Sequence, residues 1–219
     1  MAHIVITGAN RGIGLELARQ RTESDRVTAV CRAPSDELKA LGVRIEAGVD
    51  VTDDAAVGGL AKRLEGERVD VLINNAGILR RETLDDLDFD SIRQQLEVNA
   101  LGPLRVSAAL APLMGEGGKI AIITSRMGSI GDNTSGSRYG YRMSKAAVNM
   151  AGVSLAHDLA DRGISVAILH PGFVRTEMTG RNGNVEPAEA AAQLWARIDA
   201  LEPSTSGTFW HANGERLPW

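Results

Sequence analysis

The sequence predicts an α/β fold: a single doubly wound domain over residues 1–219, with a parallel sheet of about seven strands and helices on both faces. Two observations lead to this prediction. Short apolar runs alternate with helical patterns, and the runs are almost continuously apolar, as in parallel strands buried on both faces. Glycine, asparagine, serine and a Pro-Gly pair follow these runs, where an open α/β sheet binds its ligands.

The individual elements follow from local patterns. Expected strands span residues 4–7, 27–31, 43–46, 69–73, 119–124, 164–169 and 207–210. A helix follows the first strand, and further helices are expected at 53–64, 90–114, 141–162 and 187–201, the second of these interrupted at Gly102 and Pro103. Asp53 and Asp54 place carboxylates at a helix N-terminus, and Gly163 is a C-cap residue.

Composition and charge exclude several classes of protein. A net charge of −4 without any basic run argues against nucleic acid as a partner. No apolar run approaches the ~18 residues of a membrane span, and the first residues lead into a strand rather than a signal peptide. Cys31 is the only cysteine, so a reducing, cytoplasmic location is expected. No residues have the spacing of metal ligands.

A glycine-rich turn joins the first strand to the first helix. Its residues are Gly8, Asn10, Arg11, Gly12, Ile13 and Gly14. Glycines in such a turn let the backbone approach a pyrophosphate, and the helix N-terminus favours the negative charge. The alternative is a purely structural turn. The pattern favours a Rossmann-type dinucleotide-binding domain.

The end of the second strand bears on which dinucleotide is bound, because it meets the adenosine ribose in this fold. No carboxylate stands there to bind a free 2′-hydroxyl; Cys31 and Arg32 occupy the position. Arg32, together with Arg11, can clamp a 2′-phosphate. NADP(H) is therefore expected to bind in preference to NAD(H), unless both arginines merely face solvent.

Tyr141 and Lys145 are four residues apart on a predicted helix, so they share one face. A lysine ammonium stabilises a phenolate and is expected to lower the pKa of Tyr141. Such a tyrosine can give a proton to a carbonyl oxygen or take one from an alcohol. An isolated pair with this spacing is more often an ordinary surface pair, but the other motifs favour catalysis.

Together, these motifs resemble those of the short-chain dehydrogenase/reductase family. The matching residues are Thr7-Gly8-x-x-x-Gly12-Ile13-Gly14, Asn74-Asn75-Ala76-Gly77, Asn99, Ser125, Tyr141-x-x-x-Lys145 and Pro171-Gly172 with Thr176. They follow the family's order and cover residues 4–176. Residues 125–130, the Tyr141 helix and the tail at 214–219 are similar to the carbonyl-reductase-like branch that includes the C-factor proteins.

The resemblance implies an NADPH-dependent enzyme that reduces an aldehyde, ketone or quinone to an alcohol by hydride transfer. It implies that Ser125 stabilises the oxyanion, Tyr141 supplies the proton and Lys145 binds the nicotinamide ribose. It implies that Asn99 holds a relay water, although this residue can instead bend its helix. The implied cofactor residues beyond the glycine turn are Arg32, Asp50, Val51, Asn75, Ala76, Gly77, Tyr141, Lys145, Pro171, Gly172, Val174 and Thr176. Asp50 would meet the adenine amino group, or serve only as a turn former.

The resemblance leaves a second function open and bears on the oligomeric state. The C-factor likeness also fits a dinucleotide-binding signalling or regulatory protein with vestigial catalysis. Many relatives pair the tyrosine helix across a two-fold axis, so a homodimer is expected.

Ser125 lies 16 residues before Tyr141 (141 − 125), a longer interval than in many relatives, and Ser129 is a rival. We prefer Ser125 because it directly follows a strand, which puts the insertion at 132–138. Residues 177–184 are too short and too rich in Gly and Asn for a helical lid, which predicts an open substrate pocket.

Overall fold

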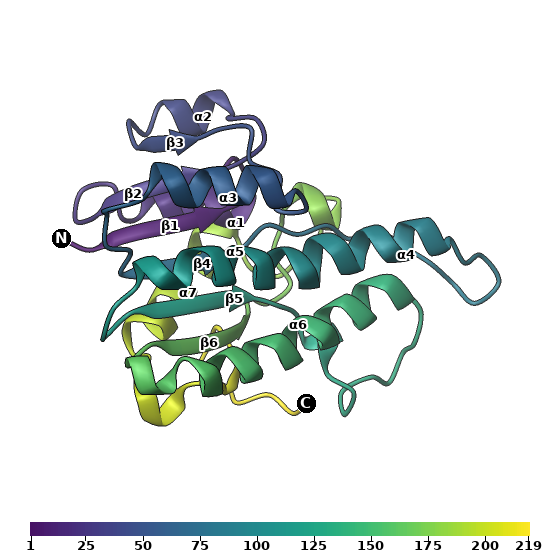
Figure 1. Cartoon of the computed structure of the whole chain (residues 1–219). Helices are drawn as coiled ribbons and strands as arrows, with labels where there is room; N and C mark the ends of the chain where they lie inside the picture. Colours follow the sequence, from purple (N-terminus) through teal and green to yellow (C-terminus); the bar gives the residue numbers. More distant parts are fainter.

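One parallel sheet organises the chain, and the structure, a computed structural model, describes residues 1–219. Its seven strands lie in the order β3-β2-β1-β4-β5-β6-β7 (Figure 1). They are β1 (His3–Thr7), β2 (Arg26–Val30), β3 (Arg44–Glu46), β4 (Val71–Asn74), β5 (Lys119–Ile123), β6 (Ser165–His170) and β7 (Phe209–His211). The predicted doubly wound α/β fold is confirmed, and the expected last strand pairs with β6 in parallel.

Helices cover both faces of the sheet and enclose two hydrophobic cores. The short α2 (Asp36–Lys39) adds to the core beneath α1 (Gly12–Arg19) and α7 (Pro187–Asp199), while α3 (Asp54–Arg63), α5 (Gly102–Leu110) and α6 (Tyr139–Asp158) cover the other (Figure 1). Strand side chains alternate between the two: Val5 belongs to one core, and Ile4 and Ile6 to the other. None of the helices is both long and apolar enough to cross a membrane.

The predicted interruption of the 90–114 helix is real, but it lies one turn earlier than expected. α4 (Phe89–Leu96) passes into a π-helical turn, Glu97–Leu101, before α5 begins at Gly102. The amide of Gly102 bonds the carbonyl of Glu97, five residues back. Pro103 has no N–H to complete an α-helical ladder here, and it is tolerated because it stands in the first turn of α5.

The boundaries of α6 also differ from the prediction. The helix begins at Tyr139 and ends at Asp158, after which Ala160–Arg162 forms a 3-10 turn. Gly163 has a φ of 66°, so it takes the left-handed C-cap position predicted for it. α2 was not predicted; the side chain of Ser35 caps it by accepting from the amide of Leu38.

Candidate active site

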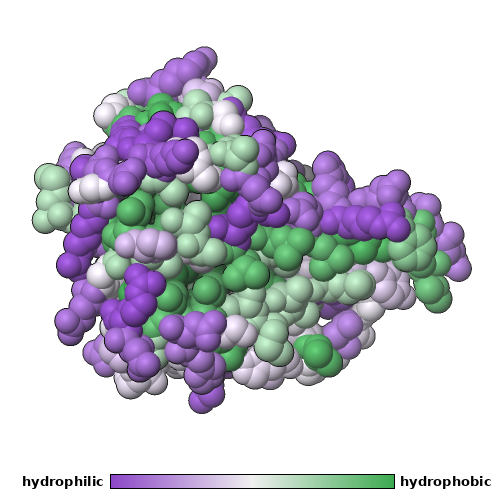
Figure 2. Space-filling model, in the orientation of Figure 1, coloured by the Kyte–Doolittle hydropathy of each residue, from purple (hydrophilic) through white to green (hydrophobic).

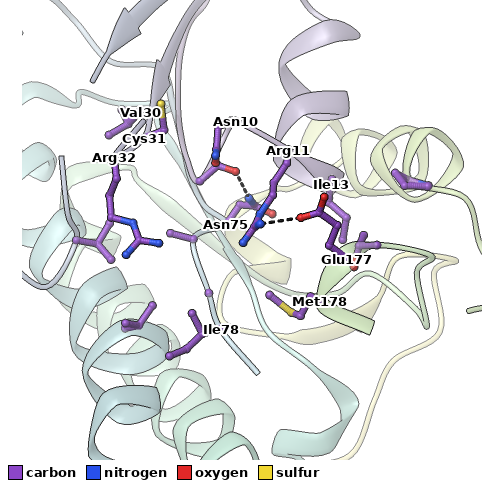
Figure 3. A pocket seen from close by; sticks show the side chains of 18 of the residues that line it. Asn10, Arg11, Ile13, Val30, Cys31, Arg32, Asn75, Ile78, Glu177 and Met178 are labelled. Carbon is purple, nitrogen blue, oxygen red and sulfur yellow. Dashed lines mark hydrogen bonds and ion pairs between the residues drawn. The ribbon is translucent and has the colours of Figure 1, made fainter. Parts of the chain in front are cut away.

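A cavity of about 750 Å³ lies beside the carboxyl ends of β1, β2 and β4, within the usual size of a cofactor site (Figure 3). The predicted residues that line it are Gly8, Asn10, Arg11, Gly12, Ile13, Arg32, Asp50, Val51, Asn75, Ala76, Gly77 and Thr176. Gly14, Tyr141, Lys145, Pro171, Gly172 and Val174 do not line it. The cavity therefore gathers most of the predicted dinucleotide residues and leaves the predicted catalytic pair beside it.

The glycine turn is held against the end of β4. Gly8 has a φ of 65°, and a Cβ there would lie 2.8 Å from the Cα of Ala76. The Asn75 amide donates to the carbonyls of Thr7 and Gly8 at 3.1 Å each. A Cβ on Gly14 would overlap the carbonyl oxygen of Gly8. Gly14 therefore supports the turn from within, which explains why it does not face the cavity.

Both arginines expected at the 2′-phosphate are already paired with carboxylates. Arg11 Nη1 lies 2.7 Å from Glu177 Oε2 (Figure 3), and Arg32 Nη1 lies 3.7 Å from Asp50 Oδ2. The arginine side chains are 66% and 74% exposed, so each pair contributes little to stability. An incoming anion can displace such carboxylates. Glu177 was not predicted as a partner of Arg11, because the two residues are 166 positions apart in the chain.

Asp50 is a turn former, the alternative role considered for it in the sequence. Its Oδ1 accepts from the amide and the hydroxyl of Thr52 at 3.0 and 2.8 Å. Burial would raise the pKa of Asp50, but the Thr52 hydrogen bonds and the charge of Arg32 lower it overall. The remaining oxygen, Oδ2, faces Arg32 at the edge of the cavity.

Ser125, Tyr141 and Lys145 meet beyond the end of β5, and each is at least nine-tenths buried. Ser125 directly follows the strand and begins the 3-10 turn Arg126–Gly128. Tyr141 and Lys145 lie on one face of α6, with Lys145 Nζ 5.7 Å from the centre of the Tyr141 ring. A Cβ on Gly128 would lie 2.6 Å from the carbonyl carbon of Lys145, so this glycine lets the serine turn pack directly on α6.

The expected lowering of the Tyr141 pKa by Lys145 is wrong. Burial raises the pKa of Tyr141 to about 12, and the Ser125 hydroxyl and the charge of Arg138 oppose this only in part. Burial lowers the pKa of Lys145 to about 8. The ammonium donates to the carbonyl of Ile123 at 2.9 Å rather than to the phenol. Desolvation, and not the attraction between the two side chains, therefore sets both pKa values.

The structure separates the two candidate serines. The Ser129 hydroxyl accepts from the amide of Asp132 at 3.0 Å and stabilises a turn. The Ser125 hydroxyl accepts from the amide of Met127 at 3.1 Å and is close enough to Tyr141 to lower its pKa. Ser125 is thus the serine beside the tyrosine.

Asn99 lies fully buried in the π-helical turn, and its side chain is used within the protein. Its Oδ1 accepts from the amide of Ile78 at 2.8 Å, while Nδ2 donates to the carbonyl of Ile78 and to Ser144 at 2.8 and 3.0 Å. The side chain therefore fastens the segment after β4 to α6. The backbone carbonyl of Asn99 is the group we expect to hold the predicted relay water. Pro103, four residues on, has no N–H to donate to this oxygen as an α-helix would.

A buried polar cluster at the start of α6 was not predicted. Glu82 is 2% exposed, and its Oε1 accepts from Gln95 Nε2 at 2.5 Å and from the Ser91 hydroxyl at 3.0 Å. Its Oε2 accepts from the amide of Gly140 at 3.3 Å. A Cβ on Gly140 would overlap Gln95 Nε2, so the glycine lets α4 pack close to α6. Gly140 beside Tyr141 was the only available signal of this cluster.

The predicted absence of a helical lid is confirmed. After Thr176 the chain forms only the 3-10 turn Glu177–Thr179 before folding back, with the amide of Asn184 donating to Phe173. Phe173 and Met178 are 52% and 43% exposed, so the wall on this side is apolar and open. The C-terminal tail lies beside the serine turn instead: the carbonyl of Trp219 accepts from the amide of Gly131 at 2.8 Å.

Comparison with known proteins agrees with this geometry. The family described as short chain dehydrogenase matches residues 2–186. The chain belongs to this family. A relative of this short-chain dehydrogenase, 1-hydroxy-2-glutathionyl-2-methyl-3-butene dehydrogenase of Rhodococcus sp. (strain AD45), is 44% identical over 226 residues and 100% of both chains. C-signal of Myxococcus xanthus is 43% identical over 154 residues, 69% of this chain and 93% of its own. NADPH-bound carbonyl reductase from chicken fatty liver superposes with a TM-score of 0.91 at 30% identity, covering 100% of this chain and 99% of that one.

This short-chain dehydrogenase is therefore an oxidoreductase of a family that binds a nicotinamide dinucleotide and acts on small molecules. The residues present fit such a cofactor. Gly8 and Gly12 leave the backbone of the first turn bare at the start of α1, where a pyrophosphate is favoured. The cavity extends from this turn past Arg32 and Val51, which gives room for the adenosine half.

Proposed function

We propose that this short-chain dehydrogenase is an NADP(H)-dependent oxidoreductase that reduces an aldehyde, ketone or quinone to an alcohol. The main support is the convergence of Ser125, Tyr141 and Lys145 beside the dinucleotide cavity. A bound nicotinamide would supply the hydride. The residues of this chain bind and orient the substrate and deliver the proton.

Tyr141 is the general acid in this proposal. With a pKa of about 12 its phenol is protonated at neutral pH, so it can donate a hydrogen bond to the substrate oxygen and then its proton. The hydroxyl of Ser125 donates a second hydrogen bond to the same oxygen as negative charge develops. Lys145, with a pKa of about 8, is still mostly protonated at pH 7, and its ammonium lies 5.7 Å from the centre of the Tyr141 ring, where it can bind the nicotinamide ribose.

The test of the reaction is a panel of aldehydes, ketones and quinones with NADPH, followed at the nicotinamide absorbance. Tyr141→Phe should lose a factor of ~10²–10⁴ in turnover, as expected for general acid catalysis, while its affinity for NADPH stays close to that of the wild type. Near-native turnover by Tyr141→Phe would refute the assignment of the proton donor.

We infer that the cofactor is NADP(H) rather than NAD(H). The support is the neutral Cys31 at the end of β2 and the two arginines that line the cavity. A charge-assisted hydrogen bond contributes ~1.5–3 kcal/mol, but each arginine would exchange a carboxylate for the phosphate. The net preference should therefore be about tenfold, equivalent to ~1.4 kcal/mol.

Titration calorimetry with NADPH and with NADH measures this preference. It should shrink at high salt and in Arg32→Gln, which leaves Arg11 as the one arginine for the 2′-phosphate, whereas Arg19→Gln, a change on the surface of α1, should retain it. Glu177→Gln should strengthen NADPH binding, because it frees Arg11. Equal wild-type affinities for the two dinucleotides would contradict the inference.

Two specific relatives supply alternatives. The full-length likeness to the Rhodococcus enzyme favours the reverse reaction, oxidation of an alcohol that bears a glutathione thioether, as a second candidate. Turnover of such an alcohol with NADP⁺ or NAD⁺ would establish it. The likeness to C-signal supports a signalling protein whose catalysis is vestigial. Tight NADPH binding without turnover of any substrate in either direction would favour that function.

A further inference from the structure

A strained turn stands at the entrance of the tyrosine helix. Ser137 and Arg138 both have a φ of 52°, and Arg138 is the residue directly before α6. Neither is glycine, so both pay a conformational penalty in the left-handed region. Strain of this kind persists only where surrounding contacts enforce it, and it is concentrated at functional sites.

The contacts that enforce this turn come from two sides. The amide of Arg138 donates to the carbonyl of Glu82 at 2.8 Å, and Glu82 itself is buried under α6. From the helix, Arg142 Nε donates to the carbonyls of Gly136 and Ser137 at 3.0 and 3.1 Å. The inserted loop at 132–138 is thus fixed at its helical end, and it holds Arg138 three residues before Tyr141.

The guanidinium of Arg138 has no partner. It makes no ion pair and no side-chain hydrogen bond, although the side chain is partly buried. By contrast, Arg11, Arg126 and Arg175 are each paired with a carboxylate within 3.1 Å. Arg80 and Arg181, which line the dinucleotide cavity, also have no ion pair, but neither directly precedes the tyrosine helix. Arg138 stands three residues before Tyr141, and its positive charge opposes the rise in the pKa of Tyr141 and contributes to lowering that of Arg142.

We propose that Arg138 binds an anionic group of the substrate, and that this short-chain dehydrogenase acts on carbonyl compounds that bear a carboxylate. The proposal rests on the proposed function, because it places the reacting oxygen at Tyr141. A guanidinium with free donors accepts a carboxylate in a two-pronged hydrogen-bonded pair. A partly desolvated cation without a counter-ion gains most from such a partner. The exposed Phe173 and Met178 offer only apolar contacts, so they would not replace Arg138 in holding the anion.

The experiment compares para-carboxybenzaldehyde with its methyl ester, as substrates with the same reacting group, using NADPH and the purified full chain. We expect kcat/KM for the acid to exceed that for the ester by about tenfold or more at low salt. Arg138→Gln should reduce this ratio to about one, and Arg138→Lys should keep part of it. Arg19→Gln removes the same charge from α1 and should leave the ratio unchanged.

The ratio, rather than the absolute rate, is the decisive quantity, because Arg138 also acts on the pKa of Tyr141. A wild-type ratio near one, with both aldehydes reduced, would overturn the proposal and leave the proposed function intact. An equal loss of activity towards both aldehydes in Arg138→Gln would also overturn it, since it would assign Arg138 to the tyrosine alone. Failure of the wild type to reduce either aldehyde would count against both proposals. Unfolding midpoints confirm that each variant is folded.

Discussion

Glu82→Ala should destabilise the protein by about 3 kcal/mol, although Glu82 touches neither the cavity nor the reacting residues. The change removes the acceptor of the Gly140 amide and the short hydrogen bond of Gln95 Nε2, which keeps only a longer one, 3.4 Å, to the carbonyl of Ser91. Each orphaned donor costs ~1–3 kcal/mol, whereas the hydroxyl of Ser91 can turn to another partner. Loss of a negative charge at the N-terminus of α6 adds ~0.5 kcal/mol. The total of about 3 kcal/mol takes a cost in the lower half of the ~1–3 kcal/mol range for each of the two donors and adds the ~0.5 kcal/mol of the charge.

Urea and thermal unfolding, monitored by tryptophan fluorescence, measure this loss. In a protein of this size, ~3 kcal/mol corresponds to a fall of roughly 6–12 °C in Tm. Glu82→Gln keeps one acceptor and should fall between the wild type and Glu82→Ala. Glu65→Ala, at an exposed position without partners, is the matched control and should stay within ~0.5 kcal/mol of the wild type. A loss below ~1 kcal/mol in Glu82→Ala would show that the cluster does not anchor α6 as the hydrogen bonds indicate.

The remaining predictions concern the serine, the lysine, assembly and the pocket. Ser125→Ala should lose more turnover than Ser129→Ala, and the reverse order would exchange their roles. The free energy of unfolding of the wild type should rise between pH 8 and pH 10.5. In this range Lys145 has lost its proton in the folded state, where its pKa is about 8, but keeps it in the unfolded state, where its pKa is the ordinary 10.5. Urea unfolding across this range should show that Lys145→Met removes the rise. Above pH 10 the free energy of unfolding should fall, because Tyr141 ionises in the unfolded chain while its pKa in the folded protein is about 12. A homodimer is expected, because apolar surface is exposed on α6 and at the start of α5, at Leu101, Leu104, Met143 and Met150 (Figure 2). Light scattering should therefore give twice 23.3 kDa, and a mass of 23.3 kDa would contradict a homodimer. Neutral substrates that differ by a ring should have kcat/KM values within about tenfold, because the side of Phe173 and Met178 is open; sharp rejection of the larger one would mean that the site closes.

The sequence by itself determined the order of the strands along the chain, the glycine turn and the shared helix face of Tyr141 and Lys145, because these depend on short-range chemistry. Val5 between Ile4 and Ile6 alternates as a buried strand must, and this pattern needs no distant partner. Asp53 caps α3 through the amides of Ala55 and Ala56, two and three residues away, so the start of that helix was readable locally. Tyr141 and Lys145 share a helix face for the same reason.

The tertiary structure alone decided the electrostatics of the site, because these depend on burial and on residues distant in the chain. The pKa of Tyr141 moved in the opposite direction from the one expected, since desolvation of the phenol outweighed every nearby charge. The ion pair of Glu177 with Arg11 joins residues 166 positions apart, and the hydrogen bond from the Gly140 amide to Glu82 joins residues 58 positions apart. No local pattern distinguishes these two glutamates from the others. Periodicity reports which face of an element is buried, but only the folded chain fixes which polar groups meet there.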